Sequence, residues 1–310
     1  MIRKPMKAPS NGATLDELKA MEYPIACSPK LDGIRGIITP VGVLSNSLKP
    51  LGNIYMQQQL TSNLFSGLDG EIVVGLPHKD LLLPDDDVFN RTTGAIRRGE
   101  GKPDFTFWAF DDFTDVTQRY DARWIHSDRP LRIHELKHPH VKILKQRICN
   151  TWQDAIAYEE ELLEMGYEGM MPRTLSGHYK EGRATAREGL ILKRKPLAQD
   201  EAVVIGLFEQ MKNNNEKAVN EMGDSFRTAH KENKEGKDTL GGVILKSPRW
   251  KDTFRCGTII GGTDDWRQKM WDNPKQIIGQ TMTYVYQEYG SIDKPRQPRA
   301  KAEFRLKEDC

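Results

Sequence analysis

The sequence has few cysteines, and no two of them lie close together. The four cysteines, Cys27, Cys149, Cys256 and Cys310, are scattered over 310 residues and form no CxxC pair. Zinc knuckles need closely spaced cysteines, and disulfide scaffolds need many cysteines in a short chain. The sequence therefore predicts neither a zinc knuckle nor a disulfide framework.

Long apolar runs are missing as well. No stretch approaches the roughly 20 apolar residues that span a bilayer, and residues 1–18 carry no signal-peptide pattern. With 37% hydrophobic and 29% charged residues, the composition is that of an ordinary globular protein. We expect a cytoplasmic protein with no membrane association and more naturally two domains than one.

The chain also lacks a strong excess of charge. Its formal net charge is +2, too small to indicate a polyanionic partner, so a nucleic-acid surface requires local clusters. Basic residues do cluster at 192–196 (LKRKP) and at 294–307 (KPRQPRAKAEFRLK), and acids cluster at 83–89, 110–113 and 158–164. For any one of these runs, a solvated face is an equally good explanation.

Helices and strands alternate in the first two thirds of the sequence without a regular βαβ repeat, which favours an α+β fold. Apolar residues at helical spacing predict helices at 15–22 and 54–65 and, most clearly, at 151–167. Residues 33–47 read as a hairpin. Further strands are predicted at 23–33, 66–75, 105–113, 141–145 and 188–196.

The pattern changes near residue 197. Short strands are predicted at 200–209, 241–247, 254–262 and 281–290, with one helix at 264–273, which is typical of a small β-barrel. A long, polar, lysine-rich connection lies between the first two of these strands, and such a connection is generally functional or disordered. We therefore predict one domain at 1–197 and a second at 198–310.

The stretch SPKLDGIRG, residues 28–36, brings together Lys30, Asp32 and Arg35. A lysine is a nucleophile only when deprotonated, and its ordinary pKa is roughly 10.4. We expect a dry strand and nearby cations (Arg35, Lys193 and Lys195) to lower that pKa, and the same cations can neutralise phosphate oxygens. Taken alone, KxDGxR is explained equally well by a surface lysine beside a turn.

Further motifs follow in a particular order: LDGE (68–71), WAFDDF (108–113), EGMM (168–171) and LILKRKP (190–196). This order resembles the covalent nucleotidyltransferases, the superfamily of ATP-dependent ligases and messenger-RNA capping enzymes. The sequence is most similar to the compact ATP-dependent DNA ligases of large DNA viruses and phages. The resemblance covers nearly the whole chain, including LSNSLKP (44–50) and HYKEGRAT (178–185).

The resemblance implies a nucleotidyltransferase (adenylation) domain followed by an OB-fold domain with a latch-like insertion at about 211–237. It implies nick sealing through a lysyl-AMP intermediate and adenylated DNA, with ATP and Mg²⁺ or Mn²⁺ as cofactors. The implied catalytic residues are Lys30, which takes AMP, together with Asp32, Lys193 and Lys195. The implied nucleotide-binding residues are Ser28, Lys30, Arg35, Glu71, Phe110, Arg183, Lys193 and Lys195.

Phe110 is the ring expected to stack on adenine, although Trp108 and Phe113 are close enough in sequence to compete, and all three could be core residues. The metal ligands implied by the resemblance are Glu168, Glu71 and Asp32. The implied partner is nicked double-stranded DNA, bound by a monomer without sequence specificity. The residues expected at the DNA are Lys49, Lys212, Lys217, Arg227, Lys231, Arg296 and Arg305.

One departure from the family pattern stands out. Related enzymes usually carry Ser-Arg where this chain has Ser45-Asn46, and that arginine ordinarily contacts phosphate. Either Lys49 or another cation compensates, or the affinity for the nick phosphate is lower here.

Three alternatives remain at this point. HELKH (134–138) matches the zinc-protease pattern HExxH, but Pro139 follows at once and should cut a helix short. A basic barrel alone could bind single-stranded DNA, but this leaves the first two hundred residues unexplained. An RNA ligase or a GTP-using capping enzyme is the alternative within the superfamily.

Overall fold

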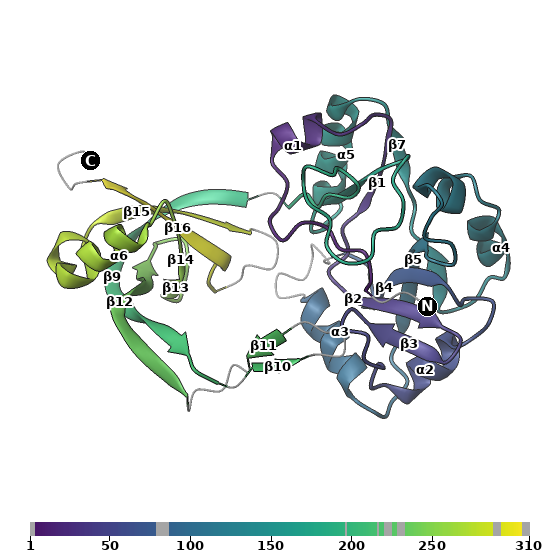
Figure 1. Cartoon of the computed structure of the whole chain (residues 1–310), viewed down its shortest axis with the longest axis horizontal. Coiled ribbons are helices and arrows are strands. Elements are labelled where there is room, and N and C mark those ends of the chain that lie inside the picture. The colour runs from purple at the N-terminus through teal and green to yellow at the C-terminus, as the bar shows by residue number, and fades with distance from the viewer. Residues whose placement is uncertain are drawn as a thin grey trace. The chain divides into compact units, whose positions relative to one another are not determined.

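The structure is a computed structural model that describes residues 4–78, 87–195, 197–215, 217–219, 225–227, 233–287 and 293–305 (Figure 1). The chain divides into two compact units, Met1–Lys195 and Pro196–Cys310. In the described part of the chain, no helix is both long and apolar enough to cross a membrane.

The first unit is built on two sheets. The larger has the strand order β3-β2-β4-β5-β6 and the smaller the order β7-β1-β8. All neighbours are antiparallel except β5 and β6. The strands are β1 (Ile25–Pro29), β2 (Ile34–Thr39), β3 (Gly42–Ser45), β4 (Leu68–Val74), β5 (Phe105–Asp112), β6 (Val141–Ile143), β7 (Arg147–Cys149) and β8 (Met170–Thr174). The predicted hairpin at 33–47 is confirmed as β2 and β3.

Helices cover the sheets of this unit. They are α1 (Leu15–Lys19), α2 (Ile54–Leu60), α3 (Val88–Arg97), the π-helix η1 (Asp121–Ile125), α4 (Arg129–Glu135) and α5 (Trp152–Glu164). The prediction for α5 is confirmed. Thr151 and Asp154 form a capping box at its start, and Ala155, Tyr158 and Leu162 are buried at helical spacing.

The alternation along β5 determines which side chains face the core. Phe105, Phe107 and Ala109 are buried in the main hydrophobic cluster. Trp108 and Phe110 are only half-buried, because successive side chains of a strand point to opposite faces. Phe110 therefore faces away from this core.

The strand predicted at 188–196 is wrong. Residues Leu190–Lys195 run beside β8 but form only the isolated bridges Met170↔Arg194 and Arg173↔Ile191. Between these bridges, the Leu192 amide donates to the Pro172 carbonyl. Pro172 has no N–H to return the bond, so the ladder is interrupted there.

The helix required by HExxH is also absent from the described structure. Helix α4 ends at Glu135, and Lys137 adopts a left-handed φ of 48°. His134 and His138 therefore do not lie one turn apart on a single helix, and the zinc-protease alternative is excluded.

The second unit contains one six-stranded sheet with the order β13-β12-β9-β15-β16-β14. The strands are β9 (Leu197–Asn213), β12 (Lys234–Lys246), β13 (Phe254–Cys256), β14 (Thr258–Ile260), β15 (Thr281–Gln287) and β16 (Arg296–Arg305), and α6 (Asp264–Asp272) and the 3-10 helix η2 (Pro274–Gln276) follow β14. The two edge strands β13 and β14 are separated only by Gly257. The sheet must therefore curl until its edges approach each other, as in an OB-fold.

The insertion in this unit is shorter than predicted. The ladder between β9 and β12 extends to the pair Asn213↔Lys234, so the connection spans 214–233 rather than 211–237. It contains two short antiparallel strands, β10 (Lys217–Val219) and β11 (Ser225–Arg227) (Figure 1). One of the basic residues expected here, Lys231, lies outside the described residues.

Asn53 generates a testable prediction about the stability of the first unit. Its Oδ1 caps α2 by accepting from the Met56 amide at 2.9 Å, and its Nδ2 donates to the carbonyls of Arg98, Glu100 and Gly101 at 3.0–3.3 Å. Asn53 is fully buried. Loss of the cap together with unsatisfied buried groups should make Asn53→Ala cost about 2–4 kcal/mol of unfolding free energy, measured by denaturant titration.

The matched control is Asp87→Ala. Asp87 caps α3 through the Asn90 amide at 2.9 Å but is more exposed and, among the described residues, bonds to no second segment. We expect a loss of about 0.5–1 kcal/mol there. Equal losses in the two variants would contradict the prediction.

Candidate active site

The first unit contains a cavity of about 510 Å³. Every residue that the sequence predicted to bind a nucleotide lines it. These residues are Ser28, Lys30, Arg35, Glu71, Phe110, Arg183, Lys193 and Lys195. Asp32 and Glu168, which were predicted to act in catalysis or metal binding, are buried, at 8% and 3% exposure, and do not line the cavity.

Strand β1 delivers Lys30 to this cavity. β1 ends at Pro29, and the Lys30 amide then donates to the Gly169 carbonyl at 2.8 Å. Gly169 has a φ of 149°, and a Cβ there would lie 3.1 Å from the Arg194 carbonyl carbon. Glycine is therefore required for Glu168, β8 and the segment before Lys195 to meet at this point.

Glu168 lies between two lysines. Its Oε2 contacts the Lys30 Nζ, and its Oε1 contacts the Lys195 Nζ. The Glu168 side chain is 1% exposed. Burial raises its pKa, but Lys30 and Lys195 outweigh burial and bring the pKa below its usual range. Glu168 is therefore ionised and shared by both amines.

The expected depression of the Lys30 pKa is wrong for the free protein. Burial does lower the pKa of Lys30, but the charges of Glu168, Glu71 and Asp32 outweigh burial, and the net pKa is raised. In this state the amine is protonated and masked. The Lys30 amine is freed from this contact only when Glu168 takes another partner.

Lys193 behaves in the opposite way. Burial, followed by the positive charges of Lys195, Lys30 and Arg183, lowers the pKa of Lys193 to about 8. Burial and Lys30 also lower the pKa of Lys195. Lys193 therefore loses its charge just above neutral pH.

Glu71 is a second carboxyl group with a shifted pKa. It lines the cavity and lies opposite Arg35 across β2 and β4. Burial raises the pKa of Glu71 to about 7, against the opposing effect of Lys30 and Arg35. Glu71 can therefore accept or donate a hydrogen bond near neutral pH.

Phe110 is the aromatic residue that lines the cavity in the described structure. Trp108 packs with Leu31 and Val73, and Phe113 is buried in a different cluster. The guanidinium carbons of Arg35 and Arg173 each lie 5.1 Å from the Phe110 ring centroid. Cation–π contacts at this distance hold the ring in place.

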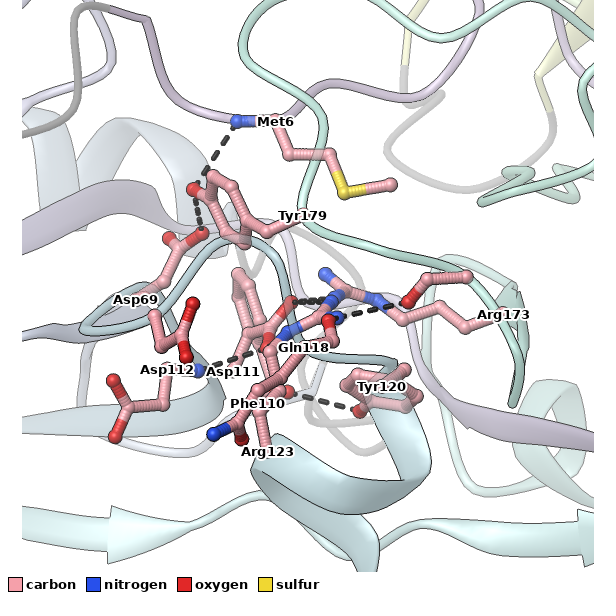
Figure 2. Close-up of polar contacts among 12 residues, drawn as sticks. Met6, Asp69, Phe110, Asp111, Asp112, Gln118, Tyr120, Arg123, Arg173 and Tyr179 are labelled. Atoms are coloured by element: carbon pink, nitrogen blue, oxygen red, sulfur yellow. Dashed lines mark hydrogen bonds and ion pairs between the residues drawn. The ribbon is translucent and has the colours of Figure 1, made fainter.

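Arg35 is itself fixed by Asp69. Its Nε donates to Asp69 at 2.7 Å and its Nη2 contacts the other carboxylate oxygen. The Tyr179 hydroxyl also donates to Asp69, at 2.7 Å (Figure 2). Sequence reasoning assigned no role to Asp69, Asp111 or Arg173. All three lie inside or beside the quoted motifs, but motif order alone does not show that they meet.

Asn46 lines the cavity together with Ser45 and Ser47. Lys49 is exposed, and the Ser45 amide donates to its carbonyl at 2.8 Å. Lys49 does not line the cavity, whereas Lys7 and Arg183 do. Cations that share the cavity wall with Asn46 and could compensate for the missing family arginine therefore include Lys7 and Arg183 but not Lys49.

The carboxylates around Lys30 suit a hard cation. Glu168, Glu71 and Asp32 all act electrostatically on Lys30, and carboxylate oxygens are preferred ligands of Mg²⁺. Within the described residues, no three acidic, histidine or cysteine side chains are close enough to hold a metal by themselves. Mg²⁺ usually takes only one or two carboxylates beside phosphate oxygens and water, so the set fits a cation that binds together with a nucleotide.

The residues predicted to contact DNA are spread over both units. Lys49 follows β3, Lys212 is exposed on β9, and Arg296 begins β16. Lys217 and Arg227 are directly paired between β10 and β11, and Arg305 ends β16. Strand β16 itself was not predicted, because its many basic residues and Pro298 are untypical of a strand.

Comparisons with solved structures identify the fold. Chlorella virus DNA ligase-adenylate matches with 28% identity and a TM-score of 0.53, covering 98% of this chain and 100% of the other. This is the architecture of a compact ATP-dependent DNA ligase. A Lig E DNA ligase (18% identity, TM-score 0.67, 96% and 99% covered) and Pmar-Lig (18%, 0.70, 98% and 68%) share the fold. No family model and no curated protein matches the sequence.

The ligase-like match places both units within one known architecture. It covers the cavity-bearing unit and the six-stranded sheet alike. The nucleotidyltransferase and OB-fold assignment made from the sequence is therefore confirmed.

The opposite pKa shifts of two cavity lysines generate a prediction. Pulse labelling with acetic anhydride between about pH 6 and 10, read by peptide mass spectrometry, should modify Lys193 with a midpoint near the pKa of about 8. Lys30 should stay unreactive over the same range, because its pKa is raised and only the neutral amine reacts. Labelling of Lys30 before Lys193 would contradict the assignment.

Proposed function

We propose that this protein is an ATP-dependent DNA ligase that seals nicks in duplex DNA, with Lys30 as the residue that carries AMP. The observation that carries the proposal is the buried contact between Lys30 and Glu168 beside a cavity lined with cations. The whole-length likeness to a DNA ligase-adenylate supports DNA over RNA or a cap as the substrate.

In the first step, the Lys30 Nζ forms a bond to the α-phosphorus of ATP. The bond from that phosphorus to the bridging oxygen of the β-phosphate breaks, and pyrophosphate leaves. Lys30 must first lose its proton and its contact with Glu168, since the protonated amine has no free electron pair. Lys193, Lys195 and Arg183 neutralise phosphate oxygens as charge develops.

Glu168, Glu71 and Asp32 are the residues that would hold Mg²⁺ or Mn²⁺. A divalent cation bound there supplies charge stabilisation to the triphosphate. Separation of Glu168 from the Lys30 Nζ unmasks the amine. Coupling the release of the nucleophile to arrival of the substrate limits side reactions of the lysine.

The remaining residues of the cavity wall orient the adenosine. Phe110 offers a ring face for the purine, and Ser28 lies at the end of β1 next to Lys30. Glu71, with a pKa of about 7, accepts hydrogen bonds from the ribose. Arg35 lies close to Phe110 and contributes a further donor.

DNA enters in the later steps. An oxygen of the 5′-phosphate at the nick attacks the AMP phosphorus, the phosphorus–nitrogen bond to Lys30 breaks, and the amine regains a proton. The 3′-hydroxyl then attacks the activated 5′-phosphate and releases AMP. Asp32 acts in these DNA-dependent steps, and a monomer suffices for all three.

The contacts with DNA are expected to be with phosphate. Lys49, Lys212, Lys217, Arg227, Lys231, Arg296 and Arg305 are the proposed cations. Phosphate contacts carry no base information, so binding is independent of sequence. With Asn46 in place of the arginine usual in the family, we expect a weaker hold on the nick phosphate.

Replacement of the nucleophile provides the direct test of this proposal. Incubation of the protein with α-labelled ATP followed by denaturing electrophoresis should give a covalent adduct. Lys30→Ala should abolish the adduct, because no other side chain presents an amine at that position. Lys49→Ala, an exposed lysine outside the cavity, is the matched control and should label normally.

Two results would overturn the assignment. One is a normal yield of adduct in Lys30→Ala. The other is efficient labelling by GTP but not by ATP, which would indicate a capping enzyme instead.

The insertion at 214–233 should act in DNA binding and not in adenylation. Because Asn213 and Lys234 are paired, an Asn-Gly turn can replace the insertion without disturbing the ladder. We expect near-normal labelling of Lys30 but weaker binding and sealing of nicked DNA. The defect should grow between about 50 and 200 mM salt, because fewer phosphate contacts remain.

A variant that removes positive charge from the insertion tests whether the insertion grips DNA as a latch or is a passive segment. Replacing Lys217, Arg227 and Lys231 with glutamine preserves the length of the segment and should lower the salt dependence of binding by roughly one unit of slope per lost phosphate contact. If the shortened protein seals nicks like the parent at about 150–200 mM salt, the latch role is wrong.

A further inference from the structure

A second group of buried charges lies beside the reacting residues. It contains two carboxylates, Asp69 and Asp111, and the guanidinium groups of Arg123 and Arg173 (Figure 2). The guanidinium group of Arg35, paired with Asp69, completes it. Asp69 and Asp111 are direct cross-strand partners on β4 and β5. Two like charges in that position repel each other unless cations compensate, so the arginines stabilise this pair of carboxylates.

Arg123 anchors Asp111 to the protein interior. Its Nε and Nη2 donate to the Asp111 carboxylate at 2.8 and 3.1 Å. Its Nη1 donates to the carbonyls of Gln118 and Gly177 at 2.9 and 2.8 Å. The Arg123 side chain is 4% exposed and does not line the cavity, so its role is to hold Asp111 still.

Arg173 connects Asp111 to the cavity. Its Nη1 contacts Asp111 Oδ2, and Arg173 is part of the cavity wall. Its guanidinium carbon lies 5.1 Å from the Phe110 centroid and 5.0 Å from the Tyr120 centroid. Arg173 is therefore held between two rings, one of which faces the cavity.

The backbone of Phe110 is fixed by the same group of residues. The Tyr120 hydroxyl donates to the Phe110 carbonyl at 2.9 Å, and the Asp112 amide donates to Asp111 Oδ1 at 2.8 Å. Asp111 therefore follows Phe110 directly in the sequence and also pairs with Arg173, the cation beside the Phe110 ring.

Removing the charge of Asp111 would disturb the balance in one direction. Asp69 is already paired with Arg35 and Tyr179, so it cannot take over Arg173 as well. The group would then contain three guanidinium groups and only one carboxylate. A buried charge without a partner moves toward water. For Arg173 the nearest polar opening is the cavity that it lines, where it would take up the space of the ligand.

We propose that Asp111 is a positioning residue, which fixes the Arg173 guanidinium beside the Phe110 ring and thereby sets how tightly the cavity holds its nucleotide. Asp111 does not touch the nucleotide, and this inference rests on the proposed ATP-dependent function of the site. The residue acts on ground-state binding of ATP and not on the transfer of AMP to Lys30.

The test measures the KM for ATP and the kcat of lysyl-AMP formation in Asp111→Asn. We expect the KM to rise about tenfold while kcat stays within about threefold of the parent, as for loss of uniform binding. The matched control is Asp112→Asn. Asp112 is also buried and paired, with Arg129 at 2.9 Å and the Thr114 amide at 2.7 Å, but its partner Arg129, unlike Arg173, does not line the cavity.

A merely structural role would reduce the amount of active enzyme in both variants and leave both KM values unchanged. An unchanged KM in Asp111→Asn, or an equal rise in Asp112→Asn, overturns the proposal.

A double-mutant cycle tests whether Asp111 acts through Arg173. Arg173→Met leaves Asp111 paired with Arg123 and should raise the KM for ATP by itself. In that background, Asp111→Asn should raise the KM no further, whereas independent effects would multiply. If Asp111→Asn does not fold, Arg173→Met decides, and an unchanged KM in it overturns the proposal.

The same experiment separates this inference from the proposed function. If the parent protein forms no adduct with ATP, the ligase assignment fails. If the parent forms the adduct and the variants match its KM, only the role of Asp111 fails.

Discussion

The contact between the Lys30 amine and the Glu168 carboxylate is the interaction on which the cavity-bearing unit depends. It joins the residue that follows β1 to the residue two positions before β8. A lysine at this depth is tolerated only with a carboxylate beside it, and a carboxylate at 1% exposure only with a cation. Glu168 meets both needs and also holds Lys195. Glu168 therefore links Lys30 to Lys195 and keeps the Lys30 amine protonated.

A second level of organisation surrounds this contact. Lys30 and Lys195 share the Glu168 carboxylate. The Phe110 ring is instead supported by two arginines, which are themselves held by Asp69 and Asp111. The two groups differ in their chemistry. Lysines change protonation state when they are buried, while guanidinium groups remain charged and planar. The unit thus uses lysine where a proton must move and arginine where a surface must stay fixed.

The sequence predicted much of the fold and eight of the residues that line the cavity, because the motifs carry these residues on strands and turns with local signals. Lys30, Glu71 and Phe110 all lie where their motifs placed them. What could not be predicted depends on distant partners. The raised pKa of Lys30 comes from Glu168, 138 residues away. The broken ladder at 190–195 is caused by Pro172 in the neighbouring strand, and the role of Arg173 depends on Asp111 across the fold.

The bond between the Met6 amide and the Tyr179 hydroxyl, 3.1 Å long, spans 173 residues. Together with the Lys30–Glu168 contact, it means that the cavity is closed by segments from the two ends of the first unit. During synthesis, these ends cannot meet until almost the whole unit has left the ribosome, and such long-range closure is slow. A nascent chain therefore carries Lys30 for most of its synthesis without the carboxylate that masks it. The reactive site is assembled late, as one of the last events in the folding of its unit.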